Sequence, residues 1–269
     1  MIKNWIFTGD THGRVDERLW NISQTVDNPE ETAIIILGDA SLNFYLNNKD
    51  AKRKESASKY GFTIYCVRGN HEARPEDIQG MTSVYDDDVK GFVYLEYDYP
   101  KIRYLSDGAI YFINDKRTLV LGGAYSVDKF YRLMNHWTWF ENEQMTQYEM
   151  EFVEGIMEGL NNKVDIILSH TCPYSWRPTD LFLDCVDQTT VDNTMELWMD
   201  VMESKWKYDY WLFGHYHADR AVRPGALMFY QGWLTLDEIP AAARGEIERF
   251  ELDPKYYYEG DKNEKANRS

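Results

Sequence analysis

Short apolar runs, each closed by a polar loop, recur along the chain and predict its strands. Five of them stand out, at residues 5–7, 33–37, 62–67, 164–168 and 210–213. Runs this short, bounded by glycine and polar residues, favour buried strands over helices. Apolar residues at helical spacing follow the first run and predict an amphipathic helix over residues 14–27, which completes a right-handed βαβ unit. The alternation of strands and helices predicts an α/β fold.

The remaining pattern predicts further helices and a second group of strands. Residues 46–60 are polar and predict a solvent-facing helix, and residues 73–90 predict a flexible acidic loop. The β-rich stretch 91–122 predicts the start of a second sheet with a local hairpin. Thr146 is placed to cap a helix whose apolar face is formed by Val153, Ile156, Met157 and Leu160. The last predicted elements are a helix at 191–202 and strands at 226–230 and near 247–250.

Each of the five apolar runs ends in a loop that carries Asp, Asn or His. The loops are Gly9-Asp10-Thr11-His12-Gly13, Gly38-Asp39, Gly69-Asn70-His71-Glu72, Ser169-His170 and Gly214-His215-Tyr216-His217. They contain five of the six histidines, and the sixth, His136, is predicted to take no part in a site. In open α/β sheets, sites collect at the carboxyl ends of the strands. Carboxylate, amide and imidazole ligands without a thiolate suit Mn²⁺, Fe or Zn²⁺, so the loops predict a metal site.

These loops, in this order, resemble the motifs of the calcineurin-like metallophosphoesterase family, in its bacterial and phage-type branch. The resemblance implies a four-layer α/β/β/α sandwich, in which helices flank two mixed β-sheets and the metal site lies at the carboxyl ends of the strands. It implies two divalent metal ions, with Mn²⁺ as the first expectation. One ion would be held by Asp10, His12 and His217. The other would be held by Asn70, His170 and His215, and Asp39 would bridge the two.

The resemblance also implies that the protein is an enzyme that hydrolyses a phosphate ester. A hydroxide that bridges the two ions would attack phosphorus, and the ions would neutralise the charge that develops. His71 would face the leaving-group oxygen as general acid or hold the phosphate, beside Asn70. Asp39 and His71 are therefore the expected catalytic residues.

One departure from the family narrows the expected substrate. Protein phosphatases of the family carry an Asp three positions after the bridging Asp, followed by Arg, whereas this chain continues from Asp39 as Ala40-Ser41-Leu42-Asn43. A small phosphomonoester or phosphodiester is therefore expected rather than a phosphoprotein. The alternatives are a nuclease or cyclic-nucleotide phosphodiesterase and, with less support because every ligand is retained, a catalytically silent metal-binding scaffold for a protein partner.

Residues 123–145 combine cations with aromatic side chains. Lys129 and Arg132 suit contacts with a phosphate group. Arg132 is a candidate substrate-binding residue, and an ion pair with one of the many acidic residues is its equal alternative. The aromatic residues Trp137, Trp139 and Phe140 favour packing of this segment against the core.

Composition limits the class of partner. A formal net charge of −16 disfavours long nucleic acid but does not exclude a small phosphate ester. No run approaches the ~20 apolar residues of a membrane helix, and the start of the chain lacks a signal-peptide pattern, so no membrane partner and a cytoplasmic location are expected. Length and motif spread predict one domain at 1–253 and a polar, frayed tail at 254–269. Substrate identity and oligomeric state stay open.

Overall fold

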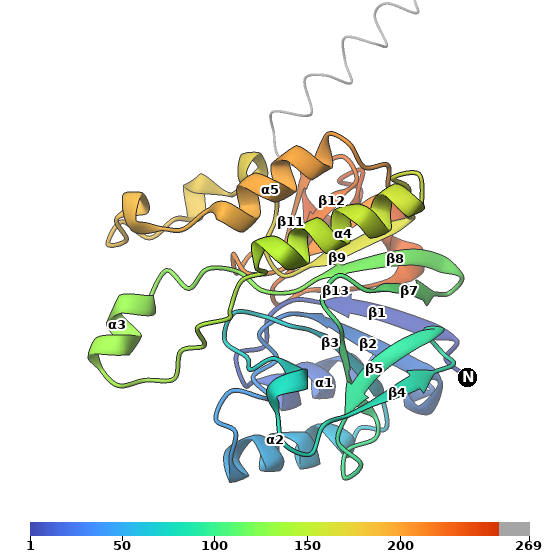
Figure 1. The fold of residues 1–269 in the computed structure, drawn as a ribbon. Coiled ribbons are helices and arrows are strands. Elements are labelled where there is room, and N and C mark those ends of the chain that lie inside the picture. Colours follow the sequence, from blue (N-terminus) through green and yellow to red (C-terminus); the bar gives the residue numbers. More distant parts are fainter. Residues whose placement is uncertain (253–269) are drawn as a thin grey trace, which may run out of the picture.

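Two β-sheets pack face to face in the computed structural model, which describes residues 1–252, and helices cover both outer faces (Figure 1). This order of layers confirms the α/β/β/α sandwich with two mixed sheets that the sequence predicts. The predicted tail at 254–269 lies outside the described residues. Within residues 1–252, no helix has the length and apolar character needed to cross a membrane.

The first sheet contains seven strands in the order β13-β1-β2-β3-β6-β5-β4. Its central strands run parallel and are β1 (Asn4–Thr8), β2 (Thr32–Leu37), β3 (Thr63–Val67) and β6 (Ile102–Leu105). Antiparallel strands complete its edges, namely β13 (Trp233–Thr235), β5 (Gly91–Leu95) and β4 (Thr82–Asp86). Because β1, β2 and β3 are parallel neighbours, their carboxyl ends lie side by side.

The second sheet contains six strands in the order β11-β12-β10-β9-β8-β7. Its parallel strands are β8 (Lys116–Leu121), β9 (Ile166–Ser169), β10 (Tyr210–Phe213) and β12 (Ala226–Met228). The antiparallel edge strands are β7 (Ile110–Ile113) and β11 (Arg220–Arg223). The carboxyl ends of β9 and β10 are neighbours in this sheet, as those of β1 to β3 are in the first.

Alternate side chains of the central strands belong to two different cores. Phe7 and Ile35 point between the sheets and pack in the same cluster as Leu168 of the second sheet. Their neighbours Ile6 and Ile34 point the other way, into a cluster beneath the helices of the first sheet. Strands covered on both faces need apolar residues at consecutive positions, which is why these runs lack polar alternation.

Four helices supply the outer layers. The first sheet is covered by α1 (Val15–Ser23) and α2 (Asn48–Ser58), and the second by α4 (Gln147–Gly159) and α5 (Thr194–Glu203) (Figure 1). Thr146 caps α4 as predicted, because its hydroxyl accepts from the Glu149 N–H and the Glu149 carboxylate accepts from the Thr146 N–H. Two further α-helices are short, α3 (Lys129–Met134) and α6 (Ile239–Ala242). The 3₁₀ turns are Pro29–Glu31, Pro75–Asp77, Tyr174–Trp176, Thr179–Leu181, Gln188–Thr190, Leu236–Glu238 and Glu248–Phe250.

The second sheet begins later in the chain than the sequence predicts. The stretch 91–122 contains β5 and β6, which belong to the first sheet, and only the β7–β8 hairpin starts the second. Strand β6 joins the first sheet by parallel pairing with β3, and it buries Ile102 and Tyr104 in the cluster under the helices. Pairing between distant strands is not encoded in the local apolar pattern, which explains the error.

Three smaller predictions are also corrected. Residues 73–90 contain the ordered strand β4, and the Asp86 carboxylate accepts from Arg103 Nη1 at 2.6 Å and from the Tyr65 hydroxyl at 2.9 Å. Helix α2 is not wholly solvent-facing, because Lys54 is buried and its ammonium pairs with Glu96. The predicted last strand near 247–250 is a 3₁₀ turn, and the short strands β11 and β13 escape prediction.

Candidate metal centre

The five predicted loops meet at one edge of the sandwich. Asp10 and His12 follow β1, Asp39 follows β2, Asn70 and His71 follow β3, His170 follows β9, and His215 and His217 follow β10. The three loops of the first sheet come from adjacent parallel strands, as do the two loops of the second. Side chains far apart in the sequence are thereby in contact, such as His12 and His217, which are 205 residues apart.

One group of side chains surrounds the Asp10 carboxylate. Oδ2 of Asp10 lies 3.6 Å from Nε2 of His12 and 3.4 Å from Nε2 of His217. The same two ring nitrogens are 2.7 Å apart. Oδ1 of Asp10 accepts a hydrogen bond from the backbone N–H of His215 at 3.0 Å, which fixes the orientation of the carboxylate.

A second group surrounds the Asp39 carboxylate. Oδ2 of Asp39 lies 3.7 Å from Nε2 of His170 and 3.9 Å from Nε2 of both His12 and His71. Oδ1 of Asn70 lies 2.8 Å from Nε2 of His170. The other ring nitrogen of His170, Nδ1, lies 2.9 Å from the carbonyl oxygen of Leu37. Because a carbonyl only accepts, Nδ1 carries the proton and Nε2 is left as a ligand.

His215 completes the arrangement from the side of the second sheet. Its ring centroid lies 5.0 Å from that of His170, and the two rings are inclined by 68°. All seven predicted metal ligands are thus in one cluster. His136 is exposed and follows the end of α3.

The glycines of the motifs leave space for ligand side chains from neighbouring loops. A Cβ atom at Gly38 would lie 2.0 Å from Nδ1 of His170, and one at Gly69 would lie 2.0 Å from Oδ1 of Asp39. A Cβ atom at Gly214 would lie 2.3 Å from Oδ1 of Asp10. Glycine is therefore required at these positions by the close approach of the carboxylates and the imidazole.

Four of the candidate ligands also have strained backbone conformations. His12, Asp39, His215 and His217 have φ angles of 44°, 46°, 70° and 54°, in the left-handed region that residues with a Cβ rarely adopt. Each such conformation costs about 1–3 kcal/mol and persists only where the surrounding fold imposes it. Four of the seven clustered residues have this conformation, and such strain is common at functional sites.

The protonation states of the two carboxylates and of His215 suit cation binding. Burial alone would raise the pKa of Asp10, but His170, His12 and His217 hold that pKa well below its usual value. For Asp39, burial is likewise outweighed by His71 and His170, and the pKa of this carboxyl is also lowered. Burial lowers the pKa of His215 to about 3, so its ring is neutral at pH 7. Ionised carboxylates and neutral imidazoles are the forms that bind metal ions.

The ligand atoms form two groups that each fit a metal ion. One contains Asp10, His12 and His217, the other contains Asp10, Asp39 and His170, and within each group the ligand atoms lie within 4.8 Å of one another. Oδ2 of Asp10 is buried and, within residues 1–252, has no hydrogen-bond partner. A buried carboxylate oxygen without a partner is costly unless a cation satisfies it. The donor set, oxygen and nitrogen without sulfur, fits a divalent transition metal.

Comparison with known sequences identifies the family. The profile of the calcineurin-like phosphoesterase family matches residues 5–219. The chain belongs to this family. The match spans all five loops and confirms the resemblance drawn from them.

Solved structures are similar in fold to this calcineurin-like phosphoesterase. One is described as the crystal structure of TT1561 of Thermus thermophilus, with 12% sequence identity, a TM-score of 0.47, and coverage of 87% of this chain and 98% of that chain. A second crystal structure has 12% identity, a TM-score of 0.50, and coverage of 88% and 96%. No curated protein matches the sequence significantly.

The α3 segment of the calcineurin-like domain reaches over the centre and brings Arg132 to His71. Nη2 of Arg132 lies 3.4 Å from Nε2 of His71. Nε of Arg132 also donates to the Asp128 carboxylate at 2.8 Å, so the structure contains both the site contact and the ion pair that the sequence left open. Of the aromatic residues predicted to pack against the core, Trp139 is half-buried and donates from Nε1 to Oε2 of Glu143, whereas Trp137 is 54% exposed, so the prediction is wrong for Trp137.

Sequence reasoning missed the residues that orient Asn70. Its Nδ2 donates to the Ser126 hydroxyl at 2.8 Å, and that hydroxyl donates to Oε2 of Glu143 at 2.5 Å. Glu143 also accepts from the Ser126 N–H at 3.0 Å and from Nε1 of Trp139 at 2.8 Å. With Nδ2 occupied in this way, Oδ1 of Asn70 is directed at His170 and the metal centre.

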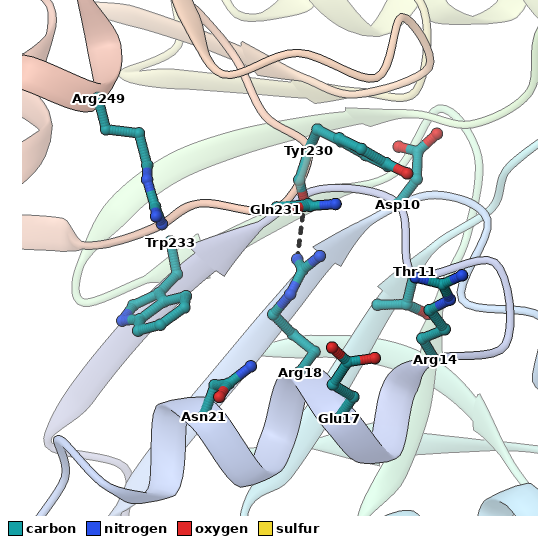
Figure 2. A pocket seen from close by; sticks show the side chains of 10 residues that line it. All are labelled: Asp10, Thr11, Arg14, Glu17, Arg18, Asn21, Tyr230, Gln231, Trp233 and Arg249. Atoms are coloured by element: carbon teal, nitrogen blue, oxygen red, sulfur yellow. Dashed lines mark hydrogen bonds between the residues drawn. The ribbon is translucent and has the colours of Figure 1, made fainter.

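Two cavities adjoin the centre of this calcineurin-like phosphoesterase, and they differ in character. The first, of about 300 Å³, lies beside Asp10 and is lined by charged residues that include Arg14, Arg18 and Arg249 (Figure 2). Arg18 Nη1 donates to the carbonyl of Tyr230 at 2.7 Å, and the Tyr230 ring stacks on His217 with centroids 4.8 Å apart. Arg18 therefore links helix α1 to Tyr230, the residue whose ring packs against the candidate ligand His217.

The second cavity, of about 350 Å³, is bounded by His215 and His217 themselves. Its other walls are mainly apolar and aromatic, including Tyr125, Phe182 and Tyr216. It therefore opens directly onto the candidate ligands from the second sheet.

Proposed function

We propose that this calcineurin-like phosphoesterase hydrolyses a small phosphate ester with two divalent metal ions. The observation that carries the proposal is the convergence of two buried carboxylates, Asp10 and Asp39, with the ring nitrogens of His12, His170 and His217. Family membership supports phosphate-ester chemistry. Mn²⁺ is the preferred candidate, and Fe or Zn²⁺ would suit the same ligands.

The two ions would be held by the seven clustered side chains, with Asp39 shared between them. Bound there, they would polarise the phosphoryl oxygens and lower the pKa of water, which is the chemistry the family requires. The family resemblance gives Asp39 the shared role, and its Oδ2 lies 3.9 Å from Nε2 of His12 and 3.7 Å from Nε2 of His170, one residue from each set; the carboxylate common to both compact groups of ligand atoms is Asp10.

The other side chains would position the ester and move a proton. We assign to the imidazole of His71, whose Nε2 lies 3.9 Å from Oδ2 of Asp39, the proton that the leaving oxygen takes up. The backbone N–H of His71 donates to Oδ1 of Asp39 at 2.9 Å and so fixes this ring relative to the centre. Arg132, beside the same ring nitrogen, would bind phosphoryl oxygens, and Asn70 would contribute its amide oxygen.

The size of the substrate is limited by charge. A net charge of −16 repels long nucleic acid, whereas a single phosphate can be attracted by the local positive charge of the centre. We therefore propose a small-molecule ester rather than a polynucleotide.

The test compares variants of the centre on chromogenic esters. Asp39→Asn and His71→Ala should each lower kcat for 4-nitrophenyl phosphate with Mn²⁺, the latter by roughly 10²–10⁴-fold as expected for loss of a general acid. His136→Ala is the matched control and should stay within twofold of the wild type. Bis(4-nitrophenyl) phosphate, assayed in parallel, separates diester from monoester preference. Undiminished turnover in Asp39→Asn, or no turnover by the wild type with Mn²⁺, Fe²⁺ or Zn²⁺, would refute the proposal.

A further inference from the structure

The cavity beside His215 and His217 is lined by apolar side chains that are exposed to solvent. Val127, Leu181 and Leu183 line it and are 44%, 38% and 62% exposed. A group of exposed aliphatic side chains next to candidate metal ligands indicates a ligand-binding site rather than ordinary protein surface. The volume of about 350 Å³ lies within the range of small-molecule sites.

Aromatic rings form the rest of the apolar wall. Phe182 and Tyr216 have nearly parallel rings, with centroids 6.5 Å apart and planes inclined by 19°. The Tyr216 hydroxyl is engaged with the hydroxyl of Thr171 at 3.1 Å. The polar end of Tyr216 is therefore satisfied by the protein, and its ring remains to contact a ligand.

Two charged side chains that line the cavity, Arg177 and Glu196, make hydrogen bonds within the protein. Arg177 donates to the side-chain oxygen of Asn193, and its guanidinium lies over the rings of Tyr174 and Phe182, 3.6 Å and 5.5 Å from their centroids. Oε1 of Glu196 accepts from the Thr171 hydroxyl at 3.0 Å, whereas its Oε2 is buried and, within residues 1–252, has no hydrogen-bond partner. The cavity therefore favours a ligand through apolar and stacking contact rather than through charge.

The cavity adjoins the centre at which the phosphate group of the proposed substrate would bind, so it suits another part of the same molecule rather than an independent ligand. Two of its lining residues are the candidate ligands His215 and His217. Two others, Tyr125 and Val127, flank Ser126, whose hydroxyl accepts from Asn70. The cavity therefore borders the metal centre at two places, through His215 and His217 and through the residues next to Ser126. In Figure 1, the yellow-to-orange segment that carries residues 174–193 extends from the sheets on the same side as α3.

We propose that this cavity binds the organic group of the phosphate ester, and that this group is a flat, apolar ring system. The proposal rests on the function proposed above, because the phosphate anchors the ester at the centre. It narrows the substrate class to aryl or similarly planar esters and places the residues that select them on the segment 174–193. Small aliphatic esters would bind through the phosphate alone.

Binding of two non-hydrolysable phosphonates to the metal-loaded full-length protein tests the proposal. Methylphosphonate and 1-naphthylmethylphosphonate present the same anionic group and differ only in the ring system. Calorimetric titration should give a Kd for the naphthyl compound at least tenfold lower than for methylphosphonate. Phe182→Ala should reduce this preference to below threefold and leave the Kd of methylphosphonate within twofold of wild type.

Two further variants separate loss of contact from loss of folding. Leu183→Ala removes a side chain that is 62% exposed, so it cannot disturb the core, and it should also reduce the preference. Phe152→Ala, on the exposed face of α4, is the control and should leave the preference unchanged. Equal Kd values in the wild type, absence of binding by both phosphonates, or an undiminished preference in both cavity variants would overturn the proposal.

Turnover of 4-nitrophenyl phosphate by the same preparation distinguishes the two proposals. Turnover without a naphthyl preference would overturn the assignment of the cavity and leave the proposed function standing. A naphthyl preference that depends on Phe182, without turnover of any ester, would support the cavity and overturn hydrolysis.

Discussion

Gly69→Ala tests whether the motif glycines act by leaving space for the carboxylate of the neighbouring loop. A Cβ atom at this position would lie 2.0 Å from Oδ1 of Asp39, whereas ordinary contact begins at 3.4 Å. The carboxylate or its loop must therefore move by about 1.4 Å. That movement would break the hydrogen bond from the His71 N–H to Oδ1, which is 2.9 Å long. Misplacement of a catalytic group by ~1 Å costs roughly 10²-fold in rate, so we expect kcat to fall at least ~100-fold, equivalent to about 2.7 kcal/mol.

The assay is steady-state hydrolysis of 4-nitrophenyl phosphate by metal-reconstituted protein, with metal content and thermal unfolding measured on the same samples. Gly155→Ala is the control, because Gly155 lies within α4 and a Cβ atom there would meet nothing within 4 Å. This substitution should leave kcat unchanged and raise the free energy of unfolding by about 0.5–1 kcal/mol. If Gly69→Ala keeps kcat within threefold of wild type, the steric explanation of the motif glycine is wrong.

Other buried groups lead to three more predictions. Ser126→Ala removes the acceptor that orients Asn70, so the apparent Mn²⁺ affinity, measured by titration of activity, should fall about 10-fold or more; an unchanged affinity would show that Asn70 is held otherwise. Burial raises the pKa of Glu196 from 4.5 to about 7, so the folded state favours the neutral carboxyl and loses roughly 3 kcal/mol of stability as pH rises from 4.5 through 7. Glu196→Gln should abolish that decline in urea unfolding between pH 5 and 8, and a persisting slope would contradict the assignment. A divalent metal at one hundred times its Kd should stabilise the protein by about 2.7 kcal/mol in thermal unfolding, and Asp10→Ala should remove most of this gain; a metal-independent Tm would exclude binding at the centre.

The strand ends were predictable because their signals are local. The five apolar runs correspond to β1, β2, β3, β9 and β10, and each ends where its loop begins. A glycine directly before a ligand residue, as in Gly38-Asp39, is also a local signal in the sequence. The reason why glycine is needed there is not local. The space at Gly38 is needed by His170, which is 132 positions later in the chain.

Pairing between distant segments was not predictable in the same way. The sequence of strand β6 suits the second sheet as well as the first, and only its pairing with β3 decides the question. The local pattern places Lys54 on a polar, solvent-exposed helix, yet Glu96 lies close enough to pair with it and allow its burial. Such choices depend on partners that the local pattern does not specify.

The sequence by itself determined the kind of chemistry, because the types of side chain and their position after each strand are fixed by the order of residues. Only the tertiary structure decided which atoms meet: the contact of Asp10 with His217, the support of Asn70 by Ser126 and Glu143, and the apolar cavity beside the centre. The physical reason is that covalent order constrains neighbours along the chain, whereas packing of the two sheets brings together residues as distant in sequence as His12 and His217, which are 205 positions apart.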